Sequence, residues 1–382
     1  MSAINFNHCD HDVSSNATKL FSALPEAAES VNLGFLEFFA GSGLVGTALA
    51  PRFNLLWAND ICPKKADVFR ANHGSGTFHL ASIASINGRE LPTAFLSWAS
   101  FPCQDLSLAG KSAGIHASRS GLVWEWLRVM NEMPARPPVL VAENVVGLVA
   151  WNSGSQYRQL HGAMAERGYR VGAFVLDAIR WLPQSRPRIF VVAVHKTAPL
   201  PSELLDRGPN WLHSKAVTKA AQGLDDWLWW KMPEPGPRGL SLSDIVDWNA
   251  PCLDEATAKK TLALVPEEHM RRLQKSGLKA VPGYKRTRNG RQVLELRFDG
   301  VAGCLRTPQG GSSRQFLAIR RGGGWQVRLL TVKETARLMG APETYRLPGK
   351  YNDGYKAMGD AVAVPAVAYL AEHILWKLAT AI

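Results

Sequence analysis

The sequence has few of the residues that mark secreted, zinc-binding or membrane proteins. Its five cysteines stand at irregular spacing, so they form neither a disulfide framework nor a zinc pattern, and His8-Cys9-Asp10-His11 has no matching ligands downstream. No basic-then-apolar leader opens the chain, and we expect no apolar run long enough to span a bilayer. We therefore expect a protein of a reducing cytoplasm, without a bound metal and without a membrane.

Acidic residues are also in deficit. The 382 residues include 32 Asp and Glu against 44 Lys and Arg, which gives a formal net charge of +12. A protein this basic typically binds a polyanion, and nucleic acid is the first candidate. The alternative is a basic surface without a specific partner. With 46% hydrophobic residues, the length predicts a large core and a second, smaller domain.

A glycine-rich turn follows the first apolar stretch. Gly41, Gly43 and a third glycine three residues later open a predicted helix, where backbone N–H groups can approach a ligand. Asp60 lies roughly twenty residues on, the position of a ribose-binding acid in nucleotide-binding folds. The motif does not separate a nicotinamide cofactor from S-adenosylmethionine, and Phe39 is either an adenine contact or a core residue.

Two later apolar stretches end in groups capable of chemistry. Residues 94–99 lead to Cys103, in a turn shaped by Pro102, and residues 138–142 lead to Glu143. Ligands and catalytic groups gather at the carboxyl ends of such strands, so Cys103 is a candidate nucleophile, although a lone cysteine is more often structural. Glu143 is either a helix N-cap or a functional acid; we favour the acid, with a pKa raised by burial.

Basic side chains gather farther along the chain. Gln184, Arg186 and Arg188 alternate on an extended segment between two predicted paired strands, so they can share one face; the alternative is a plain basic loop. Residues 200–300 are rich in Pro, Trp and basic side chains. We interpret their cations as a phosphate-facing surface and the tryptophans of residues 227–230 as the core of a second domain.

In their order along the chain, these segments resemble the cytosine-C5 DNA methyltransferase family over nearly the whole length. Six family motifs have counterparts here: Phe39-Ala40-Gly41-Ser-Gly43, Pro102-Cys103-Gln104, Glu143-Asn144-Val145, Gln184-Ser-Arg186-Pro-Arg188, Arg328 to Gly340, and Gly359-Asp360-Ala361-Val362. The resemblance implies an α/β fold, with a Rossmann-like S-adenosylmethionine-dependent methyltransferase sheet domain, a smaller target-recognition domain and duplex DNA between them.

The resemblance and the composition together predict five parts of the chain. These are an N-terminal arm (1–30), a catalytic and cofactor-binding domain (31–198), a target-recognition domain (199–330), a hinge (331–358) and a C-terminal segment that returns to the catalytic domain (359–382).

The resemblance also implies the catalytic roles. Cys103 adds to C6 of a cytosine flipped out of the duplex, Glu143 holds or protonates N3, and Arg188 with Arg186 contacts the O2 side. The loop from Ser107 to about Gly121 would close behind the base. The implied DNA contacts are Gln104, Ser107, Lys111, Arg119, Gln184, Arg286 and Arg288. The implied S-adenosylmethionine contacts are Phe39, Ala40, Gly41, Gly43, Asp60, Ile61, Ser82, Ile83, Pro102, Asp360 and Ala361.

The sequence departs from the family pattern at four places. Ser82 stands where an acid often contacts adenine, and Ile61 stands where many members have tryptophan. Asp360-Ala361 replaces an Asn-Ser pair, and Cys304-Leu305 replaces a Thr-Leu pair in the recognition region. These differences affect contacts to the cofactor and to a DNA phosphate, not the chemistry.

Three other functions are compatible with parts of the sequence. The first is a transfer-RNA cytosine-C5 methyltransferase, whose typical Cys-Phe-Thr tripeptide is absent here. The second is a nicotinamide-dependent dehydrogenase, which leaves Cys103 and Glu143 unexplained, and the third is a non-catalytic DNA-binding module. We expect a monomeric enzyme of a prokaryotic or phage-infected cell that acts on double-stranded DNA, with a possible cognate restriction endonuclease.

Overall fold

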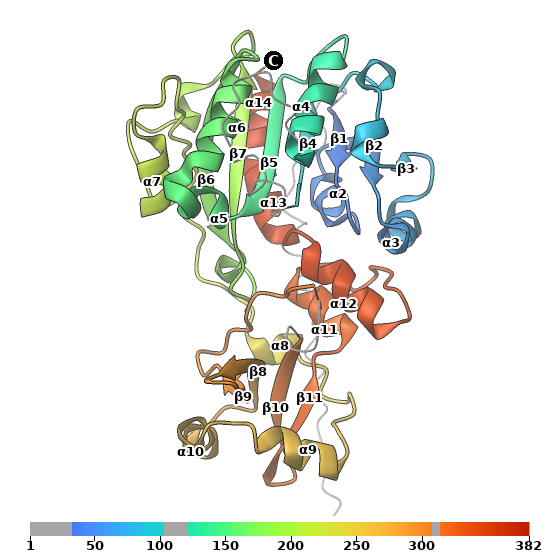
Figure 1. Cartoon of the computed structure of the whole chain (residues 1–382), viewed down its shortest axis with the longest axis vertical. Coiled ribbons are helices and arrows are strands. Elements are labelled where there is room, and N and C mark those ends of the chain that lie inside the picture. The colour runs from blue at the N-terminus through green and yellow to red at the C-terminus, as the bar shows by residue number, and fades with distance from the viewer. Residues whose placement is uncertain (1–32, 103–120, 308–313, 382) are drawn as a thin grey trace, which may run out of the picture.

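The computed structural model describes residues 33–102, 121–307 and 314–381, and it places them in two lobes (Figure 1). The larger lobe holds a seven-stranded sheet in the order β3-β2-β1-β4-β5-β7-β6. Its strands are β1 (Gly34–Phe38), β2 (Asn54–Asp60), β3 (Phe78–Leu80), β4 (Leu96–Ala99), β5 (Val139–Val145), β6 (Tyr169–Asp177) and β7 (Pro187–His195).

The first five strands pair in parallel, whereas β7 pairs antiparallel with both β5 and β6. Strand order reverses on the two sides of β1, because β2 lies beyond one edge and β4 beyond the other. In open α/β sheets such a reversal makes a crevice at the carboxyl ends of the strands, where ligands bind. The predicted doubly wound α/β sheet is confirmed.

Helices cover both faces of this sheet. They are α2 (Leu44–Leu49), α3 (Pro63–His73), α4 (Leu122–Glu132), α5 (Gly147–Ala150), α6 (Ser155–Ala165), α7 (Lys215–Ala221), α13 (Val364–Leu370) and α14 (Trp376–Thr380). Successive side chains of a strand point to opposite faces. On β1, Phe35 accordingly joins the core that includes α2 and α13, whereas Leu36 and Phe38 join the core that includes α4 and α6.

The smaller lobe is built on a four-stranded antiparallel sheet in the order β11-β10-β8-β9. Its strands are β8 (Ala280–Arg288), β9 (Arg291–Leu296), β10 (Gln315–Arg321) and β11 (Gly324–Leu329), and α9 (Glu255–Leu262) and α10 (Glu267–Lys275) accompany them. A separate apolar core forms there around Leu273, Val281, Leu294 and Val327.

Three helices lie where the lobes meet: α8 (Leu242–Ile245), α11 (Val332–Leu338) and α12 (Tyr351–Asp360) (Figure 1). A capping box opens α11, because the Thr331 hydroxyl accepts from the Glu334 amide and the Glu334 carboxylate accepts from the Thr331 amide. Helix α12 contacts both lobes. The Tyr355 hydroxyl accepts from the Gln315 amide, and the Ala357 carbonyl accepts from the Ser42 hydroxyl of the glycine turn.

The tryptophan-rich segment packs differently from the prediction. The Trp230 side chain is fully buried, and its indole N–H donates to the Val192 carbonyl of β7 at 3.3 Å. The Leu228 amide donates to the Val171 carbonyl of β6, and α7 packs against α5 and α6. Residues 227–230 therefore belong to the core of the large lobe. Segments that follow the predicted domain boundary at residue 199 thus also pack on the large sheet.

The C-terminal helices are longer and more apolar than expected from the sequence. Tyr351–Thr380 is long and apolar enough to cross a membrane by length and composition, contrary to the sequence-based expectation of no such run. In the fold, however, 61% of its most apolar window is buried inside the protein. Helix α13 packs on α2, and the Arg52 guanidinium donates to the Glu372 carboxylate at 2.8 Å. We interpret these helices as part of the large lobe's core.

Candidate active site

The strand that leads to the predicted nucleophile ends beside the strand of the predicted acid. Strands β4 and β5 pair in parallel, with Ala99 opposite Ala142. Past the end of β4, the Phe101 carbonyl accepts a 2.9 Å hydrogen bond from the buried Asn144 amide. Cys103, Gln104, Ser107, Lys111 and Arg119 lie outside the described residues. The Asn144 contact fixes the backbone two residues before Cys103.

Glu143 lies at the carboxyl end of β5 and is 6% exposed. Burial raises its pKa, while Arg188 and Arg186 act in the opposite direction. The Arg188 Nε lies 3.1 Å from the Glu143 Oε1 atom. The carboxyl caps no helix, since α5 begins at Gly147 without a side-chain cap. A buried carboxyl with a raised pKa is suited to hold a proton near neutral pH.

Arg186 is enclosed by backbone carbonyls. It is 1% exposed, and its two terminal nitrogens donate to the carbonyls of three residues at 2.6–2.9 Å: Leu305, Gly359 and Ala361. The prediction placed Arg186 beside Arg188 at a bound base. Its terminal donors are instead engaged within the protein, so Arg186 joins the large lobe to the recognition segment and to the C-terminal part of the chain.

Gln184 lies inside the protein, although it was predicted to contact DNA. It is fully buried, its amide nitrogen donates to the Leu338 carbonyl at 2.6 Å, and its amide oxygen accepts from the Leu305 amide at 3.0 Å. The prediction that Gln184 contacts DNA is therefore wrong for this structure, because the side chain has no free surface. Its alternation with Arg186 and Arg188 is real, but this face of the segment points into the protein.

The glycine turn and Asp60 form one unit at the ends of β1 and β2. Three residues of the turn have positive φ: Phe39 at 57°, Gly41 at 57° and Gly43 at 84°. Glycine adopts this conformation at little cost. The Gly41 amide donates to one Asp60 carboxylate oxygen at 2.9 Å, and the Cys62 amide donates to the other at 2.8 Å. Ile61, next to this acid, is 69% exposed. An oriented carboxylate and an exposed apolar side chain thus lie side by side.

The other predicted cofactor residues are held in different ways. The Ser82 hydroxyl accepts from the Ala84 amide at 3.3 Å, as the cap of a short turn, and the Ile83 side chain is buried. Pro102 is exposed, and the Ala40 amide donates to Asn59. Asp360 pairs with Lys65 at 2.7 Å and accepts from Thr307. The carbonyl of the neighbouring Ala361 accepts a hydrogen bond from Arg186.

Three charged residues near the site were missed by the sequence analysis. Lys65 on α3 binds Asp360, and Arg128 on α4 donates to the Ile83 and Ile86 carbonyls at 3.1 Å, which holds the turn after Ser82. Glu37 is 1% exposed and is the penultimate residue of β1. An acid inside an apolar strand was a visible signal, since ionisable residues are rarely buried without a reason.

Glu37 gives a prediction about stability and pH. Burial raises its pKa from 4.5 to about 8, the Gly46 amide opposes this, and Asp60 adds to it. The folded state therefore holds a proton that the unfolded state releases above pH 4.5, so folding loses stability as pH rises from 4.5 to 8. Glu37→Gln should increase the free energy of unfolding at pH 7 by about 3 kcal/mol, and by almost nothing at pH 4.5.

Urea unfolding at pH 4.5 and pH 7 measures this difference. Glu203→Gln serves as the matched control, because Glu203 is exposed and should show no pH-dependent gain. An equal change for Glu37→Gln at both pH values would contradict the assignment of the proton to Glu37.

Comparisons with known proteins agree with the fold and with the motifs. A sequence model described as C-5 cytosine-specific DNA methylase matches residues 33–376. The chain is 23% identical over 348 residues to the Type II methyltransferase M.HhaI of Haemophilus parahaemolyticus, covering 90% of this chain and 94% of that protein. It is 24% identical over 364 residues to the Type II methyltransferase M.BsuFI of Bacillus subtilis, covering 94% of this chain and 76% of that one.

Two solved structures share the fold. The S. pombe Dnmt2 methyltransferase matches with a TM-score of 0.57 and 19% identity over 91% of this chain and 99% of its own. The Entamoeba histolytica methyltransferase EhMeth matches with a TM-score of 0.61 and 15% identity over the same shares. Together with the family match over nearly the whole chain, the observations identify an enzyme: the chain belongs to the C-5 cytosine-specific DNA methylase family, which transfers a methyl group from S-adenosylmethionine to C5 of cytosine.

Proposed function

We propose that this enzyme methylates one cytosine within a short duplex DNA sequence, through base flipping and a covalent bond between Cys103 and C6 of the base. The observation that carries the proposal is the buried Glu143, which lies 3.1 Å from Arg188 and next in the sheet to the strand that leads to Cys103. The acid thus lies on the strand that pairs in parallel with the strand preceding Cys103 in the sequence. The thiolate must approach C6 from above the ring plane, which stacked neighbours cover in a duplex, and N3 is engaged in base pairing, so the base must leave the stack.

Each group has one part in the proposed reaction. The Cys103 thiolate adds to C6 while the Glu143 carboxyl protonates or holds N3, so that C5 becomes nucleophilic. C5 then takes the methyl group and gives its proton to solvent water, the electrons of the former C5–H bond expel the thiolate, and N3 returns its proton to Glu143. Arg188 faces the O2 side of the base and stays beside Glu143. Arg186 keeps this arrangement in place through its three carbonyl contacts.

The residues around the glycine turn suit S-adenosylmethionine, which supplies an electrophilic methyl group when bound. Asp60 has both oxygens oriented by backbone amides and keeps lone pairs for the ribose hydroxyls. The exposed Ile61 offers an apolar contact to adenine, and a Cβ on Gly41 would meet nothing closer than 3.9 Å, so its backbone is open to a ligand. Phe39 and Pro102 are proposed to border the same pocket.

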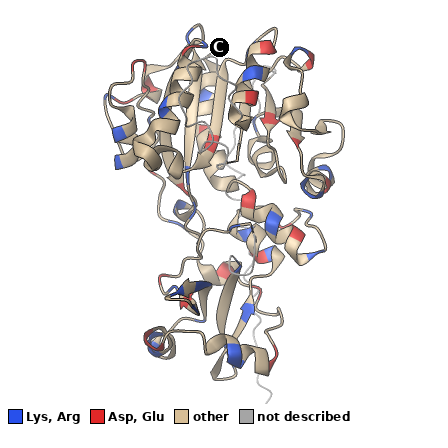
Figure 2. Ribbon diagram, viewed as in Figure 1, with Lys and Arg blue, Asp and Glu red and all other residues tan. Residues whose placement is uncertain are grey.

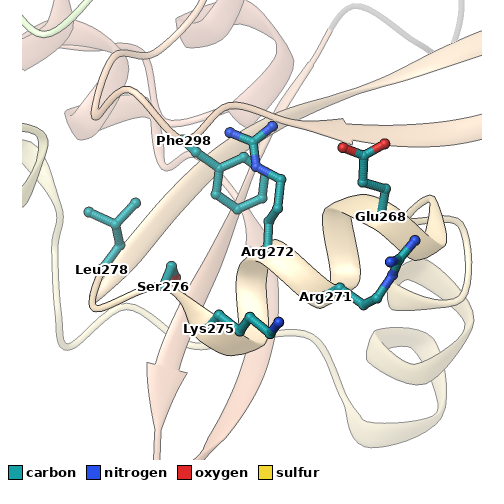
Figure 3. A pocket seen from close by; sticks show the side chains of 7 residues that line it. All are labelled: Glu268, Arg271, Arg272, Lys275, Ser276, Leu278 and Phe298. Atoms are coloured by element: carbon teal, nitrogen blue, oxygen red, sulfur yellow. The ribbon is translucent and has the colours of Figure 1, made fainter.

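Two groups of cations on the smaller lobe are proposed to face DNA phosphates. Figure 2 shows Lys and Arg on the β8–β9 hairpin and on α10. A cavity of about 550 Å³ lies along α10, lined by Arg271, Arg272, Lys275 and Phe298 among others (Figure 3). The Arg272 guanidinium lies over the Phe298 ring, 4.3 Å from its centroid. The hairpin cations Arg286 and Arg288 both reach Glu295.

Salt dependence of DNA binding tests the hairpin. The double variant Arg286→Ala/Arg288→Ala should reduce the slope of log K against log salt concentration by roughly one to two, because each phosphate contact contributes about 0.9. Fluorescence anisotropy at four salt concentrations measures this slope. Lys377→Ala, an exposed cation on α14, should leave it unchanged. An identical slope in the double variant would remove the hairpin from the DNA face.

A base-resolution map of 5-methylcytosine tests the proposed function. The enzyme is expressed in a host without cytosine methylation, and the empty expression vector provides the control. Methylation at one short motif is the expected result, and it would also identify the target sequence. An unmethylated genome, from cells that contain folded protein able to bind S-adenosylmethionine, would contradict a DNA substrate. 5-Methylcytosine in transfer RNA would then support the RNA alternative.

We further propose that the enzyme acts as a monomer in a prokaryotic or phage-infected cell and protects DNA from a cognate endonuclease. Support comes from its relatives, which are named as Type II methyltransferases of bacteria. Light scattering of the purified protein tests the monomer. Challenge of the modified DNA with endonucleases specific for the mapped motif tests the protection.

A further inference from the structure

The segment Ala302–Leu305 passes from the smaller lobe into the large lobe beside the active site. The Ala302 carbonyl accepts from the Ser185 amide at 2.9 Å, and its amide donates to the Pro183 carbonyl at 2.7 Å. The Leu305 amide donates to the Gln184 side chain, and the Leu305 carbonyl accepts from Arg186. The residues before and after Cys304 are therefore fixed to the segment that carries Arg186 and Arg188.

The same four residues are fixed from the side of the smaller lobe. The Gln315 amide group of β10 binds the Gly303 backbone twice, at 2.7 and 3.0 Å. The Tyr284 hydroxyl of β8 donates to the Cys304 carbonyl at 2.8 Å, and a Cβ on Gly303 would collide with that tyrosine. The position of Cys304 is thus set by both lobes at once.

The Cys304 side chain contacts both Arg186 and Arg188. Its Sγ atom lies 3.3 Å from the Arg186 Nη1 atom and 3.9 Å from each terminal nitrogen of Arg188. The opposite edge of Arg188 presents Nε to Glu143 at 3.1 Å. The order in space is therefore thiol, guanidinium, carboxyl, and the guanidinium of Arg188 is held between the other two.

The electrostatic setting strengthens these contacts. Burial acts against ionisation of the thiol, but Arg186, Arg188 and then Arg306 more than offset it, so that the pKa of Cys304 falls below its ordinary value. The two guanidinium groups therefore favour the ionised form of the sulfur, which is a charged acceptor. Hydrogen bonds to such an acceptor are stronger than those to a neutral one.

We propose that Cys304 is a positioning residue, whose sulfur holds the Arg188 guanidinium in the orientation that contacts Glu143 and the base. The inference rests on the proposed role of Glu143 and Arg188 at the cytosine. The proposed role explains a departure from the family pattern. Where relatives often have threonine, Cys304 provides a longer, polarisable acceptor that reaches both arginines. The smaller lobe would thereby act on the chemical step and not only on DNA binding.

Cys304→Ala and Cys304→Ser test the proposal in the full-length enzyme. Alanine removes the acceptor, so kcat should fall roughly ten- to hundredfold through misorientation of Arg188, with little change in KM for DNA or Kd for S-adenosylmethionine. Serine retains an acceptor and should recover a substantial part of kcat. Cys252→Ala is the matched control, because Cys252 also accepts from an arginine, Arg321, at 3.7 Å, and it should leave kcat unchanged.

Two results would overturn the proposal. One is an unchanged kcat in Cys304→Ala, and the other is an equal loss in the alanine and serine variants together with a lower melting temperature, which would indicate a purely structural role. Glu143→Gln, assayed in parallel, separates this inference from the proposed function. If Glu143→Gln stays active, the role of Glu143 fails; if it is inactive while Cys304→Ala is normal, only the inference about Cys304 fails.

Discussion

Replacing Cys103 with serine is expected to abolish methyl transfer while leaving DNA binding intact. A cysteine thiol ionises near pH 8.5 when free and more readily beside cations, whereas a serine hydroxyl stays protonated at neutral pH. Without addition to C6, C5 of cytosine is too weak a nucleophile to take the methyl group. We expect kcat to fall by at least about 10⁴-fold, on the scale seen when a nucleophile is removed.

Transfer of radiolabelled methyl groups to DNA and an electrophoretic mobility assay measure the two effects separately. DNA that contains 5-fluorocytosine adds a direct readout, because fluorine at C5 cannot leave as a proton does and the covalent complex accumulates. The wild type should form this complex and Cys103→Ser should not. Cys252→Ser is the control and should behave as the wild type. Normal turnover by Cys103→Ser would exclude the covalent mechanism.

Replacing Glu143 with glutamine is expected to lower kcat by roughly 10²- to 10⁴-fold. Glutamine keeps the shape of the side chain but cannot transfer a proton to N3. Because burial raises the pKa of Glu143, the protonated form persists to a higher pH than in an ordinary carboxyl. Wild-type kcat should therefore decline as pH rises through this raised pKa, and Glu143→Gln should lose that decline.

Single-turnover rates between pH 6 and pH 9 provide the test. Glu166→Gln, an exposed glutamate after α6, is the control and should retain the wild-type profile. The same alkaline decline in Glu143→Gln would assign the titration to another group. Wild-type rates in that variant would remove Glu143 from the chemistry.

The sheet and the ends of its strands were predictable because they depend on local patterns. Buried parallel strands need unbroken apolar runs, and tight turns at their ends need glycine, so Gly41 and Glu143 were placed correctly at strand ends. The paired strands on either side of Gln184 were also correct. Chemistry that requires a particular residue at the end of a strand can be read from one stretch of sequence.

Contacts between distant segments were not predictable. Gln184 was assigned to DNA through the family resemblance, yet its amide binds Leu305 and Leu338, which lie 121 and 154 residues away in the chain. The tryptophans of residues 227–230 were assigned to the second domain by composition, but the fold carries them back onto β6 and β7. Composition indicates how much apolar surface a segment can bury, but it does not indicate which other segment covers that surface.

The sequence alone therefore determined the fold class and the family, and it supplied the candidates for the reacting groups, since each depends on residue type and order along the chain. Only the tertiary structure decided which arginine stays next to Glu143 and which is enclosed by carbonyls, and that Cys304 touches both. The reason is physical: a hydrogen bond depends on distances of about 3 Å, and these are set by packing between segments far apart in the sequence.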